Sequence, residues 1–166
     1  MPPLVFADHI GLPFFVGFPR VYRRFAEAGL SDEVVFIGSG KLGLPHNAVL
    51  AMALGCDLIN VGREAMFAIG CIRAQRCHTG RCPTGVATQS EWLAHGLDPA
   101  DKAARRPVLV ALRVELQRLA DACGVSHPAA IPLGALELVD HRYDATTARH
   151  AFGYEPGWGL PPAARR

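Results

Sequence analysis

The stretch Val34-Val35-Phe36-Ile37-Gly38-Ser39-Gly40-Lys41 joins a short apolar run to a glycine-rich turn. The apolar half contains three β-branched residues, a composition typical of a parallel strand that is buried on both faces. The two glycines in the second half let the backbone turn tightly and approach a ligand closely. We therefore predict a buried strand over Val34–Ile37 that runs into a ligand-binding turn at Gly38–Lys41.

The same pattern returns one unit later in the chain. Leu58–Val61 is a second apolar run, and Gly62-Arg63 breaks it. The intervening segment His46–Leu54 is expected to form a helix that stops at Gly55. Because a helix between two strands normally leads back to the same sheet, we predict that the two strands are adjacent and parallel. The fold class is therefore α/β.

Further helices are expected on both sides of these two βα units. Val21–Ala28 precedes the first strand, and Glu64–Ala74 follows the second. Pro107–Cys123 is the clearest helix, because proline suits its first position and Gly124 its C-terminal cap. The apolar face of this helix consists of Leu112, Leu116, Leu119 and Cys123.

Four segments carry weaker signals. Met1–Pro19 contains too many prolines and glycines to be a regular helix throughout. Trp92–Ala94 is expected to form one turn of helix, and Leu133–Val139 a short helix or an extended segment. Gly153–Arg166 is expected to be either disordered or packed down as a tail.

The two glycine turns are candidates for phosphate binding. Each follows a buried strand and precedes a helix, where backbone N–H groups and the positive end of the helix dipole favour an anion. In a (β/α)8 barrel, the loops after the seventh and eighth strands commonly form such a site. The candidate phosphate-binding residues are Gly38, Ser39, Gly40, Lys41, Gly62 and Arg63.

Three of the five cysteines, Cys71, Cys77 and Cys82, follow in the spacing C-x5-C-x4-C. The arginines between them favour thiolate, the form that ligates a metal, and thiolate selects zinc or iron–sulfur clusters. A cluster that lacks one iron corner suits three cysteines, and a Cys3His zinc site with His78 suits them too. Two other readings are a disulfide between the last two thiols in an exported protein and a buried apolar role for Cys71 at a helix end.

Composition indicates a globular protein. The chain has 166 residues, of which 50% are hydrophobic and 19% are charged. A net charge of +2 argues against nucleic acid or an anionic membrane as a partner. No apolar run approaches the ~20 residues of a membrane helix. The sequence shows no targeting segment, so we expect a cytoplasmic location.

The segment Gly70–Gln89 resembles the cluster loop of glutamate synthase and its FMN-binding relatives. It reads Gly-Cys-Ile-Arg-Ala-Gln-Arg-Cys-His-Thr-Gly-Arg-Cys-Pro-Thr-Gly-Val-Ala-Thr-Gln, and the resemblance extends upstream to about Pro3 and downstream to about Val139. The relatives carry Thr-Gly where this chain has Leu44-Pro45, so one backbone donor is absent here.

The resemblance implies a set of cofactors and a domain plan. Cys71, Cys77 and Cys82 would hold a [3Fe–4S] cluster, and the two glycine turns would grip the phosphate of FMN. Residues 1–90 would be the last two βα units of a TIM (β/α)8 barrel, with the iron–sulfur loop at residues 71–89. Residues 91–140 are expected to be a helical extension, and residues 141–166 a poorly ordered tail.

The resemblance also implies an activity: reductive transfer of glutamine-derived ammonia to 2-oxoglutarate, which gives glutamate. The cluster would relay electrons to FMN from ferredoxin or from a reducing subunit, and an amidotransferase would supply ammonia. Since only two of eight barrel strands are expected here, we expect a fragment or subunit that is inactive unless another chain supplies the rest. No residue stands out as a catalytic acid, base or nucleophile.

Two other functions remain open at this point. An N-methylglutamate synthase-type subunit would share the fold and use another amine donor. A metal-stabilised module that binds a partner without turnover would keep the cysteines and need no flavin.

Overall fold

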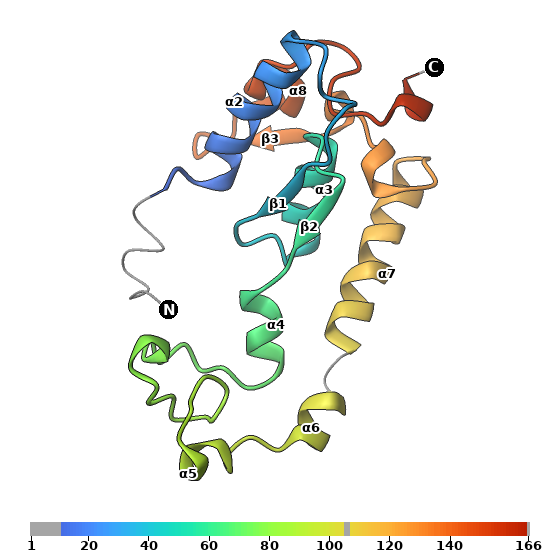
Figure 1. The fold of residues 1–166 in the computed structure, drawn as a ribbon. Helices are drawn as coiled ribbons and strands as arrows, with labels where there is room; N and C mark the ends of the chain where they lie inside the picture. The colour runs from blue at the N-terminus through green and yellow to red at the C-terminus, as the bar shows by residue number, and fades with distance from the viewer. Residues whose placement is uncertain (1–10, 105–106, 166) are drawn as a thin grey trace.

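The computed structural model describes residues 11–104 and 107–165 of the chain. Figure 1 shows a small parallel sheet at the centre, α7 alongside it, and α4 leading away to the cysteine loop. The helices are α2 (Phe14–Glu27), α3 (Pro45–Ala53), α4 (Arg63–Ala68), α5 (Glu91–Ala94), α6 (Pro99–Ala104), α7 (Pro107–Ala122) and α8 (Ala148–Phe152). The strands are β1 (Ile37–Ser39), β2 (Leu58–Asn60), β3 (Glu137–Val139) and β4 (Ala145–Thr147). Short 3₁₀ turns lie at Cys77–Thr79, Pro128–Ala130, Leu133–Ala135 and Pro162–Ala164.

The central sheet confirms the prediction of two adjacent parallel strands. β1 and β2 pair in parallel with Ile37 opposite Leu58 and Ser39 opposite Asn60, and α3 connects them. β1 nevertheless begins at Ile37, so the predicted bounds of Val34–Ile37 are wrong. The ladder starts only after Phe36, whose carbonyl oxygen accepts hydrogen bonds from the backbone N–H groups of Asp57 and Leu58. Gly38 and Ser39, assigned to the turn from sequence, therefore belong to the strand.

The prediction that these strands are buried on both faces is wrong within the described residues. Gly38 is buried, and a Cβ added there would lie 2.6 Å from the Cys56 Sγ atom. On the opposite face, Ile37 is 63% exposed and Leu58 is 55% exposed. The reason is that helices cover one face of this two-stranded sheet and no described segment covers the other.

α2 and α4 differ from the predicted helices. α2 starts at Phe14 and carries Pro19 inside it, seven residues earlier than the predicted start at Val21. α4 ends at Ala68, so the predicted extension to Ala74 is wrong. Gly70 takes φ 98°, the N–H of Cys71 donates to the Met66 carbonyl, and that of Gly70 donates to Phe67. These two bonds form a Schellman motif, which ends the helix.

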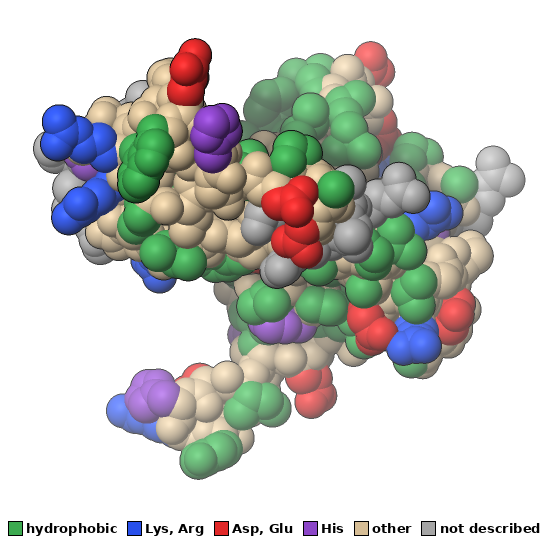
Figure 2. Space-filling model, turned by 90° about the horizontal axis from the view of Figure 1, so that it is seen from below, with side chains coloured by type: hydrophobic (Ala, Val, Ile, Leu, Met, Phe, Trp, Pro, Cys, Tyr) green, Lys and Arg blue, Asp and Glu red, His purple; other side chains and the backbone are tan. Residues whose placement is uncertain are grey.

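α7 confirms the predicted helix, although its buried stripe is different. Leu116 and Ala120 are buried against Val49 of α3, and Leu112 packs beside them. Leu119 and Cys123 are exposed, so the face that packs follows the spacing i, i+4, i+8 from Leu112. The N-terminal half of α7 exposes Val108, Leu109 and Val110. Figure 2 shows hydrophobic side chains spread between charged ones over the face seen from below.

The C-terminal segment packs onto the core, the second of the two alternatives that the sequence left open. Tyr154 is buried, its ring stacks on that of Tyr22 with centroids 5.4 Å apart, and its hydroxyl donates to the Leu54 carbonyl. The N–H of Gly159 donates to the Tyr22 hydroxyl at 3.0 Å. Arg165 closes the segment with two hydrogen bonds to the Asp32 carboxylate, at 2.7 and 2.8 Å. Burial raises the pKa of Tyr154.

No described helix is both long enough and apolar enough to cross a bilayer.

The predicted single turn at Trp92–Ala94 is present as α5, and Leu133–Val139 divides into a 3₁₀ turn followed by β3. β3 pairs with β4 in an antiparallel hairpin whose register places Glu137 opposite Thr147.

Gly159 offers a test of the C-terminal packing. Its φ is 84°, and an added Cβ would overlap the Ala53 carbonyl oxygen. We expect Gly159→Ala to lower the free energy of unfolding by about 2–4 kcal/mol, since both backbone strain and a clash arise. Urea unfolding of the whole chain measures the change.

Gly157→Ala is the matched control for this prediction. Gly157 has nearly the same φ, 85°, but a Cβ there meets nothing within 4 Å. Gly157→Ala should lower the free energy of unfolding only by the cost of backbone strain, about 1 kcal/mol. Equal losses for the two variants would show that the segment does not press against α3 at Ala53.

Candidate functional site

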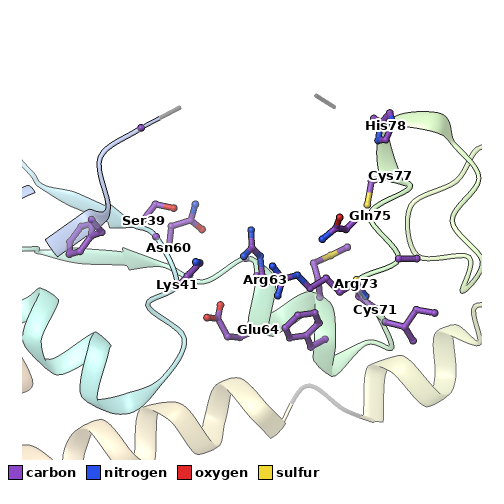
Figure 3. A pocket seen from close by; sticks show the side chains of 18 of the residues that line it. Ser39, Lys41, Asn60, Arg63, Glu64, Cys71, Arg73, Gln75, Cys77 and His78 are labelled. Atoms are coloured by element: carbon purple, nitrogen blue, oxygen red, sulfur yellow. The ribbon is translucent and has the colours of Figure 1, made fainter. Parts of the chain in front are cut away.

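One cleft of about 940 Å³ gathers the residues that the sequence singled out. It opens between the two glycine turns on one side and the cysteine loop on the other, and Figure 3 shows Lys41 and Cys77 on opposite walls. The predicted site residues that line it are Ser39, Gly40, Lys41, Gly62, Arg63, Cys71, Cys77 and Cys82. Gly38 does not line it and lies beneath, against Cys56 and Phe14.

The first glycine turn is held in a conformation that depends on Gly40. Gly40 takes φ 142° and a Cβ there would lie 2.9 Å from that of Phe14, so a larger residue cannot replace it without movement. Lys41 follows in a left-handed conformation with φ 61°. The Asn47 side-chain amide donates to the Lys41 carbonyl at 3.1 Å. α3 thereby fixes the turn that precedes it.

Pro45 removes one backbone N–H group close to the first glycine turn. It occupies the first position of α3, where a backbone N–H has no partner within the helix. Pro45 therefore leaves the start of α3 intact.

The second glycine turn has open space where a ligand would approach. Gly62 has an ordinary φ of −105°, and a Cβ added there meets nothing within 4 Å. The folded chain itself therefore does not require glycine at this position. Gly62 lines the cleft, so the space beside its Cα atom is open to the cleft. Arg63 follows directly and begins α4.

The cysteine loop folds through a series of left-handed residues. Arg73 and Gln75 take φ 56° and 58°, although neither is glycine. Gly80 takes φ 70° and ends the 3₁₀ turn that starts at Cys77. Gly85 takes φ 74°, and a Cβ there would lie 2.6 Å from the Leu93 carbonyl oxygen. The positive φ angles of Gly80 and Gly85 favour glycine at both positions and let the loop turn tightly.

Two of the three sulfurs accept hydrogen bonds or lie close to donors. Cys82 is only 7% exposed, and the Thr84 hydroxyl lies 3.4 Å from its Sγ atom. Burial acts to raise the pKa of Cys82, but hydrogen bonds from the Thr84 side chain and from the backbone at Ala87, Thr84 and Val86 outweigh it and lower the pKa. The Arg73 N–H donates to Cys71 Sγ at 3.4 Å. Hydrogen bonds of this kind stabilise thiolate.

The described residues contain no three His, Cys, Asp or Glu side chains that are gathered closely enough to hold a metal ion. Cys71, Cys77 and Cys82 share one cleft, and all three are free thiols, so the alternative of a disulfide is not present. Their convergence on one point, with or without His78, stays a prediction for the loaded protein. The donor set and the hydrogen bonds to sulfur fit a thiolate-bound centre.

The structure adds residues that the sequence analysis passed over. Asn60 lies opposite Ser39 at the carboxyl end of the strand pair, and both line the cleft. A polar residue in an apolar run, two positions before Gly62, is the sequence signal for Asn60. Glu64 lines the same cleft, and a Cβ on Gly43 would lie 2.5 Å from its carboxyl carbon.

Cys56 and Cys123 lie outside this cleft. Cys56 is buried beneath β1, where desolvation raises its pKa to about 12 and keeps it a thiol. Cys123 is exposed at the end of α7. Neither is among the residues that line the cleft.

Several known proteins are similar to this chain in sequence. The chain is 40% identical over 123 residues to the glutamate synthase large subunit-like protein YerD of Bacillus subtilis. The aligned region covers 74% of this chain and 23% of that protein. It is 38% identical over 125 residues to an archaeal glutamate synthase [NADPH] of Methanocaldococcus jannaschii, with 75% and 24% covered. A ferredoxin-dependent glutamate synthase of Pyropia yezoensis is 42% identical over 91 residues, 55% of this chain and 6% of that protein.

This chain spans about a quarter of the length of the first two relatives. Residues 2–126 match the family described as the conserved region in glutamate synthase. The match includes both glycine turns and all three cysteines of the cleft. The chain belongs to the glutamate synthase family.

Proposed function

We propose that this chain forms the flavin-phosphate and iron–sulfur part of a glutamate synthase-type oxidoreductase. The reaction is reductive transfer of glutamine-derived ammonia to 2-oxoglutarate, giving glutamate. One observation carries the proposal: a single cleft brings together two glycine turns that suit a phosphate and three cysteines that suit an iron–sulfur centre. Family membership is consistent with both groups.

We infer that β1 and β2 are the last two strands of a (β/α)8 barrel. The exposed face of Ile37 and Leu58 would then face the barrel interior, which in this architecture is filled by branched side chains from several strands. Ser39 and Asn60 lie at the carboxyl end of this face, where barrel enzymes place their sites. The remaining strands would lie outside these 166 residues, on the same or on another polypeptide.

In this proposal the phosphate of FMN binds against Gly40, Lys41, Gly62 and Arg63. Gly62 leaves room for the phosphate to approach the backbone, and Lys41 and Arg63 line the same cleft and supply positive charge. α4 has only six residues, so the cations and backbone N–H groups contribute more than a helix dipole. FMN supplies hydride transfer when bound, while these residues bind and orient it.

Cys71, Cys77 and Cys82 would hold a [3Fe–4S] cluster, which supplies one-electron transfer when bound. The hydrogen bonds to Cys71 and near Cys82 would stabilise negative charge on sulfur and tune the potential. Relatives are named as NADPH-dependent and as ferredoxin-dependent. The electron donor of this protein would accordingly be ferredoxin or a reducing subunit, and an amidotransferase would supply ammonia.

Gly62 tests the phosphate site. In protein that binds FMN, Gly62→Ala should weaken FMN binding about tenfold or more, because a methyl group displaces the phosphate from a backbone donor. Flavin fluorescence titration measures the dissociation constant. Stability in urea should change by less than about 0.5 kcal/mol, since the Cβ meets no atom of the chain.

Gly134→Ala serves as the control for Gly62→Ala. Gly134 likewise lacks a positive φ and has open space around an added Cβ, but it does not line the cleft. The Gly134→Ala variant should bind FMN with the same dissociation constant as the natural protein. If both variants bind equally well, the phosphate does not lie at Gly62.

The three cysteines of the cleft are tested by iron and acid-labile sulfide content after anaerobic purification. Replacing Cys71, Cys77 or Cys82 by Ser should deplete both, since each thiolate is a ligand in the proposal. Cys123→Ser, at an exposed position outside the cleft, should retain them. Cys56→Ala should retain them as well, alanine being used because a buried serine hydroxyl would lack a partner.

A different metal content would favour the alternative function, a metal-stabilised module that binds a partner without turnover. Stoichiometric zinc without sulfide, lost on His78→Ala, would replace the cluster by a Cys3His structural site. Iron that survives every single cysteine replacement would contradict the assignment of these ligands.

A further inference from the structure

The cleft collects positive charge from three separate segments of the chain. Lys41 comes from the first glycine turn, Arg63 from the second, and Arg73 and Arg76 from the cysteine loop; all four line the cleft. Figure 3 shows Arg73 extending from the cysteine loop toward Arg63 in the middle of the cleft, with Lys41 beyond. Glu64 is the acidic residue among those that line this space, so the described lining carries a surplus of positive charge.

The backbone of Arg73 carries an independent sign of a specific role. Arg73 is left-handed, with φ 56°, a conformation that costs a non-glycine residue of order 1 kcal/mol or more and clusters at functional sites. Glycine would remove this cost. Arginine at such a position indicates that its side chain is needed where this backbone directs it, which is into the cleft.

We propose that Arg73 is a phosphate-binding residue, so that the cysteine loop itself forms part of the anion site with Lys41 and Arg63. The ligand chemistry is a terminal phosphate dianion, and a guanidinium can bind two of its oxygens at once. The identity of that phosphate as the one on FMN rests on the proposed function, whereas the anion site does not.

This assignment links the two parts of the cleft. The N–H of Arg73 donates to Cys71 Sγ, and the side chain of the same residue reaches the anion. An anion that holds the Arg73 side chain therefore also restricts the backbone beside the first cysteine of the proposed cluster. Phosphate binding and the order of the cysteine loop should increase together.

The test compares Arg73→Gly, Arg73→Ala and Arg81→Ala in the purified full chain. Calorimetric titration uses three probes: inorganic phosphate, FMN and riboflavin, which lacks the phosphate. Both Arg73 variants should weaken phosphate and FMN binding roughly tenfold to a hundredfold, the range for a lost charged hydrogen bond, and leave riboflavin binding unchanged. Arg81→Ala removes the same charge from the same loop at an exposed position outside the cleft, and should change binding less than about twofold.

The glycine variant separates the side chain from the backbone. Arg73→Gly relieves the left-handed strain and should raise the urea midpoint while it weakens phosphate binding. If Arg73→Gly binds phosphate as the natural protein does and only Arg73→Ala is weakened, the effect is a backbone one and the inference falls. It also falls if Arg81→Ala loses as much affinity as Arg73→Ala, if riboflavin binding drops with FMN binding, or if the natural chain binds no phosphate.

The same experiment distinguishes failure of the inference from failure of the flavin proposal. Phosphate binding that depends on Arg73, without FMN binding by the natural protein, supports the anion site and counts against the flavin. FMN binding that is undiminished in both Arg73 variants supports the flavin and overturns the role of Arg73.

Discussion

The site depends on one register, the pairing of β1 with β2 across the α3 crossover. The Asp57 carboxylate accepts a hydrogen bond from the Phe36 N–H at 2.8 Å, and the Phe36 carbonyl accepts from the N–H groups of Asp57 and Leu58. These bonds determine where the ladder begins, and they place Ser39 opposite Asn60. A shift by one residue would turn every side chain of the strand to the other face. Both glycine turns would then leave the cleft they share.

The hydrophobic core that supports β1 and β2 lies on one face of these two strands only. α2, α3 and the C-terminal segment meet around Tyr22, which contacts Leu54 and Tyr154 in one buried cluster. Leu42, Ala51 and Cys56 form a second cluster directly beneath the glycine turn. The opposite face of the pair stays apolar and exposed at Ile37 and Leu58. In the proposed barrel, this exposed face would be covered by side chains from the other strands.

The cleft is organised by charge and by backbone conformation rather than by regular elements. Lys41 and Arg73 both occupy left-handed conformations on opposite walls, and Arg63 begins α4 between them. The short α4 ends at a Schellman motif, which turns the chain so that Cys71 faces the same space. Hydrogen bonds then lower the pKa of Cys82 in spite of its burial, which favours the thiolate form of this one cysteine.

The sequence by itself determined the features that depend on near neighbours. The glycine turns, the cysteine spacing, the α3 crossover and the α7 helix with its proline start all follow from residues a few positions apart. Tertiary structure decided what depends on distant contacts: the start of β1 after Phe36, the exposed face at Ile37, and the packing of Tyr154 onto Tyr22. It also brought Arg73 into the cleft that the two glycine turns line. Local propensity cannot specify these features, because register, burial and the convergence of loops are set by segments far apart in the chain.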